Sequence, residues 1–319
     1  MFFNSLDPIF SISILSSLGL VTTLSTAWSI VSFIFFNSAS NSFKNFNELF
    51  TKVKCINKKR VSVAVAQDEP VLEAIKEVVR EGLVEAILVG NKEEIQDIAK
   101  KIDMNLEQVQ IINEKDVRKA TLKAVEIVSN GQADMVMKGL VDTATFLRSV
   151  LNKEVGLRTG KLMSHVSVFD VEKMNKLLLL TDAAFNTYPD VNAKKDMIEN
   201  AVQVARSCGI DTPKVAVVAP VEVVNMDMQA TVDAAILAKM NDRGQIKGCI
   251  VDGPFALDNA ISVEAAYHKG ISSEVAGKAD ILLLPNIDVA NVMYKTLTYM
   301  SDSRNGGVLV GTAAPVILT

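Results

Sequence analysis

Short apolar runs alternate with amphipathic segments along most of this chain. The run VSVAVA at 61–66 is typical of a buried strand. The segment PVLEAIKEVVREGL at 70–83 follows it, with apolar positions three and four residues apart and Pro70 in the first turn of the expected helix. The same alternation continues to residue 151. It predicts right-handed crossovers and a mostly parallel sheet, and therefore an α/β fold.

A second region repeats this pattern. Its expected strands are at 162–170, 176–182, 214–220, 246–253, 279–285 and 306–319, with helices at 196–210 and 231–242 between them. A length of 319 residues is long for a single core and suggests two α/β domains. We place the change of domain near Gly156.

The first 43 residues differ from the rest. No charged side chain occurs from Pro8 to Phe43, and this run is long enough to cross a bilayer as a helix. It lacks the basic start of a secretory signal, while the lysines that follow it favour a cytoplasmic C-terminal domain. Three interpretations stay open: an extension absent from the natural product, a membrane anchor, and a cleaved signal. We treat 1–43 as an apolar N-terminal extension.

Composition excludes several function classes. A net charge of -4 argues against a nucleic-acid partner, because binding a phosphate backbone needs a basic face. Three widely spaced cysteines without a CxxC pair indicate a reducing compartment, and with only two histidines they argue against a metal site. No P-loop, GxGxxG or GxSxG motif is complete.

Two of the apolar runs end in polar or turn-forming residues: GCIVDGP at 248–254 and ADILLLPNID at 279–288. In open α/β sheets, ligands bind beyond the carboxyl ends of the strands. Seven polar or small residues of this block are therefore expected near one cleft: Asp252, Gly253, Pro285, Asn286, Asn291, Tyr294 and Lys295.

This block, with KGLVDTATFLRSVLNKEVGLRTGK at 138–161 and TDAAFNTYPD at 181–190, resembles the phosphate acetyltransferase and phosphate butyryltransferase family. The likeness runs from about Phe43 to Thr319 and is closest to the butyryl branch. It implies the two-domain fold of isocitrate and isopropylmalate dehydrogenases, with the active site in the interdomain cleft. The first domain would comprise 44–155, rejoined by 304–319, and the second 156–303.

The resemblance implies reversible transfer of a short acyl group, with butyryl favoured, between CoA and inorganic phosphate. Such a site must bind a phosphate dianion, polarise a carbonyl and remove a thiol proton. The candidate catalytic residues are Arg148, Tyr294 and Lys295. Residues of the matching segments are the candidates for substrate binding: Lys138, Gly139, Thr143, Thr145, Arg158, Asn286, Asn291, Gly311 and Thr312.

Structural roles compete with these functional ones. Asp142 or Thr143 could only cap a helix, Tyr294 could be a half-buried helix residue, and the loop with Arg158 could be an interdomain turn. Asp182 and Asn186 match the family pattern Asp-x-Ala-x-Asn, and Ala183 stands where acetyltransferases often carry a cysteine.

The family pattern also implies a Ser-Arg segment directly after Thr319, with an acidic thiol base beyond it. We therefore expect either impaired activity or a fragment of an intact enzyme. No permanently bound cofactor is expected, since CoA is a substrate, and the protein is expected to be a cytoplasmic homo-oligomer. The alternatives are a catalytically degenerate, membrane-tethered paralogue that binds CoA or an acyl phosphate, an acyl-ACP phosphate acyltransferase, and a nicotinamide-linked dehydrogenase.

Overall fold

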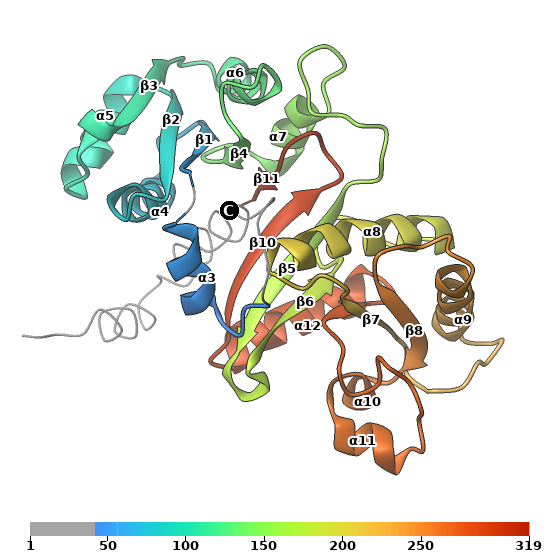
Figure 1. The fold of residues 1–319 in the computed structure, drawn as a ribbon. Helices are drawn as coiled ribbons and strands as arrows, with labels where there is room; N and C mark the ends of the chain where they lie inside the picture. Colours follow the sequence, from blue (N-terminus) through green and yellow to red (C-terminus); the bar gives the residue numbers. More distant parts are fainter. Residues whose placement is uncertain (1–41, 56, 319) are drawn as a thin grey trace, which may run out of the picture.

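Eleven strands form one continuous sheet in the order β3-β2-β1-β4-β11-β10-β5-β6-β9-β7-β8 (Figure 1). The computed structural model describes residues 42–55 and 57–318, so nearly all of the apolar run at 8–43 lies outside the described residues. The strands are β1 Lys59–Ala64, β2 Val84–Gly90, β3 Val109–Asn113, β4 Met135–Lys138, β5 Ser164–Val171, β6 Lys176–Thr181, β7 Lys214–Val218, β8 Ile250–Phe255, β9 Ile281–Leu283, β10 Arg304–Val310 and β11 Val316–Ile317.

The helices cover both faces of the sheet. They are α3 Phe46–Val53, α4 Glu69–Arg80, α5 Lys92–Lys101, α6 Val117–Ser129, α7 Thr143–Val150, α8 Val191–Ser207, α9 Gln229–Asp242, α10 Leu257–Ile261, α11 Val263–His268 and α12 Ile287–Met300. Among the described residues, none of these helices is long and apolar enough to cross a membrane. The predicted α/β class and mostly parallel sheet are confirmed.

The sheet contains two parallel blocks that run in opposite directions. One block is β3-β2-β1-β4-β11 and the other is β6-β9-β7-β8. Between them, β10 and β5 pair antiparallel to each other and to their outer neighbours. The carboxyl ends of the two blocks therefore point to opposite edges of the sheet.

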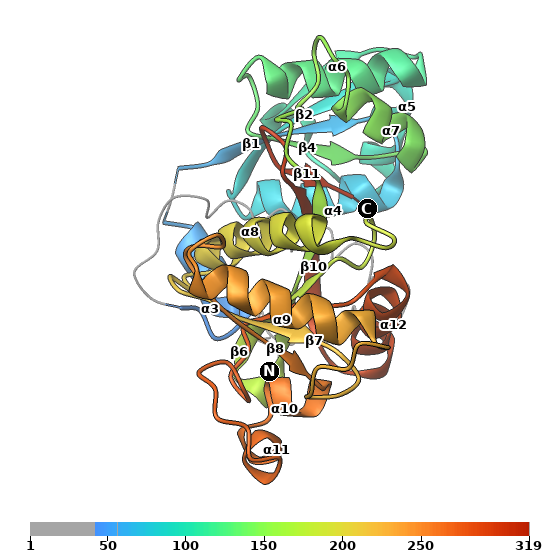
Figure 2. The ribbon, with the colours of Figure 1, turned by 90° about the vertical axis from the view of Figure 1, so that its right-hand side faces the viewer.

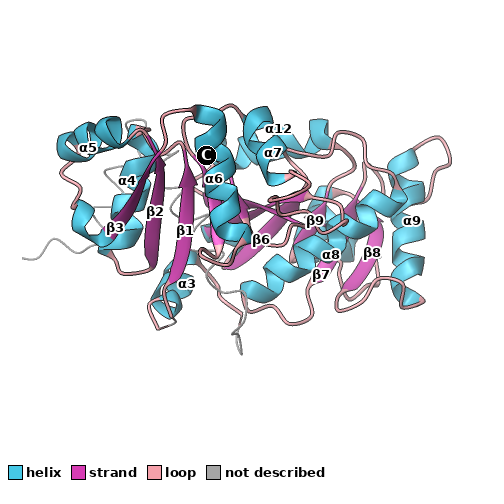
Figure 3. Ribbon diagram, turned by 90° about the horizontal axis from the view of Figure 1, so that it is seen from above, coloured by secondary structure: helices cyan, strands magenta, loops and turns pink. Residues whose placement is uncertain are grey.

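Successive side chains of each strand point to opposite faces of the sheet, so the core has two layers. On one face, α3, α4, α5, α8 and α9 pack over a single cluster that includes Val61, Val166 and Ile198. On the other face the core is divided: α6 and α7 cover a cluster around Phe146 and Leu309, and α10, α11 and α12 cover a cluster around Phe169 and Ala290. Figure 3 shows α4 and α5 on one side of β1–β3 and α6 on the other.

A strip of the central strands separates the two clusters of the divided face. The register pairs Ser167 with Gly307 and Phe169 with Asn305, and it places His165 beside Leu309. Because paired residues share a face, His165, Ser167, Asn305 and Gly307 lie between the α6/α7 cluster and the α12 cluster. We call these four residues the central strip.

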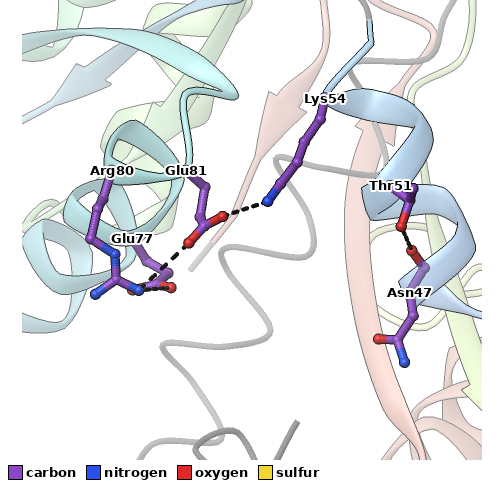
Figure 4. Close-up of polar contacts among 6 residues, drawn as sticks. All are labelled: Asn47, Thr51, Lys54, Glu77, Arg80 and Glu81. Carbon is purple, nitrogen blue, oxygen red and sulfur yellow. Dashed lines mark hydrogen bonds and ion pairs between the residues drawn. The ribbon is translucent and has the colours of Figure 1, made fainter. Parts of the chain in front are cut away.

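Helix α3 contacts the end of α4 and the central strand β5. Its buried side chains Phe46, Leu49 and Val53 belong to the undivided core. At its C-terminal end, Lys54 Nζ lies 2.6 Å from Glu81 Oε2 next to α4 (Figure 4). At its start, Asp170 of β5 accepts a hydrogen bond from the Phe46 N–H and also pairs with Arg304 of β10. The exposed pair at Lys54 stabilises little, so burial of the apolar face holds this helix.

Two expected strands differ from the structure. The predicted strand at 246–253 begins only at Ile250 and continues to Phe255, because Gly253 and Pro254 lie within the strand instead of ending it. The predicted strand at 306–319 is two strands, β10 and β11, joined by a turn at 311–315. The proposed domain boundaries stay a prediction.

Candidate active site

The segment after β4 turns sharply into α7. A Cβ at Gly139 would collide with the carbonyl oxygens of Val65 and Ala64, so only glycine fits where the Gly139 N–H donates to Ala64 O at 2.8 Å. Asp142 is the N-cap of α7, and its Oδ1 accepts a hydrogen bond from Thr145 N at 2.8 Å. The capping role considered for Asp142 is thus observed, and the exposed Thr143 follows it as the first helical residue.

Lys138 is half-buried beneath this turn. Its Nζ donates to Gly139 O and Val141 O, both at 3.2 Å. Burial lowers the pKa of Lys138, while the charges of Asp68 and Asp142 oppose that shift. Burial conversely raises the pKa of Asp68 against the influence of Lys138. Lys138 therefore tethers the loop through two carbonyl groups, and its charge lies behind the start of α7.

Arg148 lies on the exposed side of α7. It lines a groove of about 240 Å³ together with Arg118 of α6, Thr145 and Ser149. The pKa of the Asp142 carboxyl is lowered, first by the hydrogen bonds from Thr145 and further by the charge of Arg148. Two guanidinium groups beside one groove favour an anionic ligand.

Helix α12 supplies the second group of candidates. Asn286 caps the helix, with Oδ1 accepting from Val289 N at 3.1 Å, and Asn291 Nδ2 donates to Ala183 O at 3.0 Å. Tyr294 donates its hydroxyl to Asn305 Oδ1 at 3.0 Å, and burial raises the pKa of this phenol. Lys295, next to it, is exposed. Tyr294 is therefore a half-buried helix residue whose hydroxyl already has a protein acceptor.

The segment at 181–186 is built around a buried carboxylate. Asp182 is 1% exposed and accepts hydrogen bonds from the backbone N–H groups of Ala184, Phe185 and Asn186, and from Asn186 Nδ2. Its Oδ2 also accepts from the backbone N–H of His165 at 3.0 Å. Asp182 thus holds the turn after β6 against the first residues of β5.

The loop with Arg158 meets the turn between β10 and β11. Thr159 Oγ1 donates to Gly311 O at 2.5 Å, and the Ala313 N–H donates to Leu157 O at 2.9 Å. Gly311 has a φ of 93°, and Thr312 Oγ1 donates to Ala314 O within the turn. This turn lies at the amino end of β4, because Pro315 O accepts from Val136 N.

The structure thus brings the predicted residues together in separate groups. Lys138, Gly139, Thr143, Thr145 and Arg148 gather at the carboxyl end of β4. Arg158, Gly311 and Thr312 gather at its amino end, and Asn286 and Asn291 lie next to the 181–187 segment. Asp252 and Gly253 belong to the edge strand β8, which lies two strands beyond β9 in the sheet. There, Ser273 donates to Asp252 Oδ2.

The groups on α7 and α12 share one face of the sheet. Both helices lie on the same side of the ribbon in Figure 2, and the central strip runs between the clusters that they cover. Among the described residues, those that line the groove beside Arg148 do not include Lys295. The catalytic roles expected for Arg148 and Lys295 stay predictions.

One residue of the central strip was not among the predicted site residues. His165 was considered only as a metal ligand, yet it lies in β5 between the 181–186 segment and α12. Its ring centroid is 6.3 Å from that of Tyr294. A polar imidazole inside the apolar run LMSHVSVFD was the available signal.

Comparison with known proteins agrees with the family resemblance. The family model described as "Phosphate acetyl/butaryl transferase" matches residues 45–120 and 114–319. A phosphate butyryltransferase of Clostridium beijerinckii is 70% identical over 276 residues, which cover 86% of this chain and 91% of that protein.

Solved structures agree with this assignment. A branched-chain phosphotransacylase from Enterococcus faecalis superposes with a TM-score of 0.74 at 32% identity, over 82% of this chain and 91% of that one. A 4-hydroxythreonine-4-phosphate dehydrogenase from Klebsiella pneumoniae, 13% identical with a TM-score of 0.50 over 82% of this chain and 90% of that one, shares the fold alone. The predicted dehydrogenase-like fold is confirmed, and the chain belongs to the phosphate acetyl/butaryl transferase family.

Proposed function

We propose that this protein reversibly transfers a short acyl group between CoA and inorganic phosphate, with butyryl preferred to acetyl. The 70% identity to a protein named phosphate butyryltransferase, over 86% of the chain, carries the proposal. Acyl-CoA and phosphate are its substrates. The proposal includes no resident metal or cofactor, and it places the protein in the cytoplasm.

The basic groove beside α7 is the proposed phosphate-binding region. Arg148 is exposed and lines this groove, and its guanidinium can pair with two phosphate oxygens. Thr143 and Thr145 lie in the first turn of the same helix, where the helix dipole favours an anion. Lys295 adds an exposed positive charge from α12.

We assign positioning roles to Tyr294 and Asn291 on α12, and to Thr159 and Gly311. Tyr294 orients α12 through Asn305, and Asn291 ties this helix to Ala183. Thr159 and Gly311 fix the loop that carries Arg158.

The proposed assembly is a homo-oligomer formed through the part of the chain after β7. Large apolar side chains are exposed there, including Met226 at 79%, Tyr267 at 80% and Met300 at 81%. Exposed apolar residues of this size favour burial against another copy. Light scattering at several protein concentrations tests it, and a monomer throughout would contradict it.

A thiol-release assay tests the function. The protein is mixed with butyryl-CoA, with and without phosphate, and free CoA is followed over time; acetyl-CoA is then compared under the same conditions. We expect release that depends on phosphate and is faster with butyryl-CoA. Binding of butyryl-CoA without release would instead favour the degenerate paralogue.

Variants locate the phosphate site. Arg148→Gln is expected to lower kcat/KM for phosphate by roughly tenfold or more, since a hydrogen bond to a charged group contributes about 1.5–3 kcal/mol. Arg243→Gln, at the exposed end of α9, is the control and should leave activity unchanged. Equal activity of both variants would remove Arg148 from the site.

A further inference from the structure

We propose that His165 donates a hydrogen bond from Nε2–H to the acyl carbonyl oxygen and stabilises the negative charge that develops there; this inference rests on the proposed function. His165 is 8% exposed, on the sheet face between the α6/α7 and α12 clusters. The residue belongs to none of the segments predicted to form the site.

The tautomer follows from the partner of the other ring nitrogen. Ser167 is fully buried, and its Oγ lies 3.3 Å from His165 Nδ1, which is its single hydrogen-bond partner among the described residues. A buried hydroxyl whose hydrogen is unsatisfied costs about 1–3 kcal/mol. The Ser167 O–H therefore donates to Nδ1, which must carry the lone pair, and the proton of the neutral ring is on Nε2.

The Nε2–H donor has no protein acceptor within the described part of the chain. Gly307, paired with Ser167 across β10 and β5, leaves room for the ring, because a Cβ there would lie 2.5 Å from Nε2. Gly307 is partly exposed, so this position is reachable from outside the core. His165 Nε2 is not among the fully buried atoms of the described chain that lack a partner, so its N–H is accessible beside Gly307 and can donate to a ligand atom.

The surroundings distinguish a carbonyl from a phosphate. Leu309 pairs with His165, and the Tyr294 ring stands edge-on at 74° to the imidazole. Burial lowers the pKa of His165 and the charge of Asp182 only opposes this shift, so the ring is neutral at neutral pH. A neutral donor beside Leu309 and the Tyr294 ring suits an acyl group better than a dianion, which Arg148 and Lys295 match in charge.

In the proposed step, a phosphate oxygen attacks the thioester carbon and a C–O bond forms. The carbonyl oxygen gains negative charge while it accepts the Nε2–H hydrogen bond. Collapse of this intermediate breaks the C–S bond, and CoA leaves with the proton that hydrogen phosphate carried. His165 neither gains nor loses a proton, and its contribution is electrostatic.

Four variants, one control variant and one spectrum test the proposal on the full chain. His165→Leu removes the donor and is expected to lower kcat by about 10²–10³, with little change in KM for phosphate. His165→Gln retains an N–H donor and should recover part of that loss. Ser167→Ala removes the hydroxyl that keeps the His165 proton on Nε2, and Gly307→Ala places a methyl group against Nε2. Each variant should therefore lower kcat. His268→Gln, at an exposed site, is the control and should match the unmodified chain.

The tautomer is read independently of activity. A long-range ¹H–¹⁵N spectrum contains only two histidine rings, and His268→Gln assigns them. We expect His165 in the Nε2–H form at neutral pH, and an Nδ1–H or cationic ring would overturn the proposal. So would a His165→Leu protein with kcat within about threefold of the unmodified chain, or equal losses in the Leu and Gln variants with a matching fall in stability. If the unmodified chain releases no CoA, the proposed function and the carbonyl role both fail, while the spectrum still decides the tautomer.

Discussion

The buried ion pair between α8 and α9 gives a sharp stability test. Lys194 Nζ lies 2.6 Å from Asp233 Oδ2, and these side chains are 5% and 4% exposed. Gln229 Nε2 donates to the other carboxylate oxygen at 2.7 Å. Lys194→Met keeps the apolar stem but leaves a buried carboxylate with one amide partner. Breaking such a pair from one side costs about 3–5 kcal/mol of unfolding free energy.

Two further variants, a double variant and a surface control, make this test specific. Lys194→Met combined with Asp233→Leu removes both charges and should recover most of the loss, because apolar replacement of a buried pair is often neutral. Lys195, one residue further along, pairs with Glu199 at 2.7 Å on the surface, so Lys195→Met should cost only about 0.3–0.5 kcal/mol. Urea unfolding with unchanged slopes measures all three. Similar midpoints for Lys194→Met and Lys195→Met would refute the reasoning.

Two further predictions concern titrating groups. Burial raises the pKa of Cys208 to about 12 and of Cys249 to about 11, so at neutral pH a disulfide reagent should label only the exposed Cys55 in the folded protein and all three cysteines after unfolding; fast labelling of either buried thiol contradicts this. Burial holds the pKa of His165 below 6.5 against the charge of Asp182, so the unfolded chain takes up a proton first as the pH falls, and stability should fall from about pH 6.5 down to the lowered pKa. Urea midpoints of His165→Gln should lack this part of the pH dependence, and parallel curves would contradict it.

Sequence patterns predicted the first half of the fold well. The strands β1, β2 and β4 are largely buried runs, and α4 to α6 each have one apolar stripe, so local periodicity reports their environment directly. The directions of β10 and β5 could not be predicted in this way. They depend on pairing between residues such as Gly307 and Ser167, which lie far apart in the sequence. The opposite polarity of the two parallel blocks follows from that pairing.

The candidate site residues also divide into those whose roles depend on sequence neighbours and those whose roles depend on distant strands. The capping pattern located Asp142 correctly, because this role depends on neighbouring residues. The acceptor of Tyr294 and the contact of Thr159 with Gly311 depend on the assembled sheet, and no local motif encodes them. His165 was missed for a related reason: its interest comes from the hydroxyl on one nitrogen and the glycine beside the other.

The uninterrupted ladder from β3 to β8 has a mechanical consequence. Seven residue pairs join β10 to β5 and six join β5 to β6, so separating the two sides would break backbone hydrogen bonds along the middle of the molecule. Motion that admits a large substrate must then come from elastic twisting of the whole sheet or from displacement of surface helices, and not from a swing about a loose connector. A substitution that disrupts β5 or β10 should therefore perturb the structure of both parallel blocks.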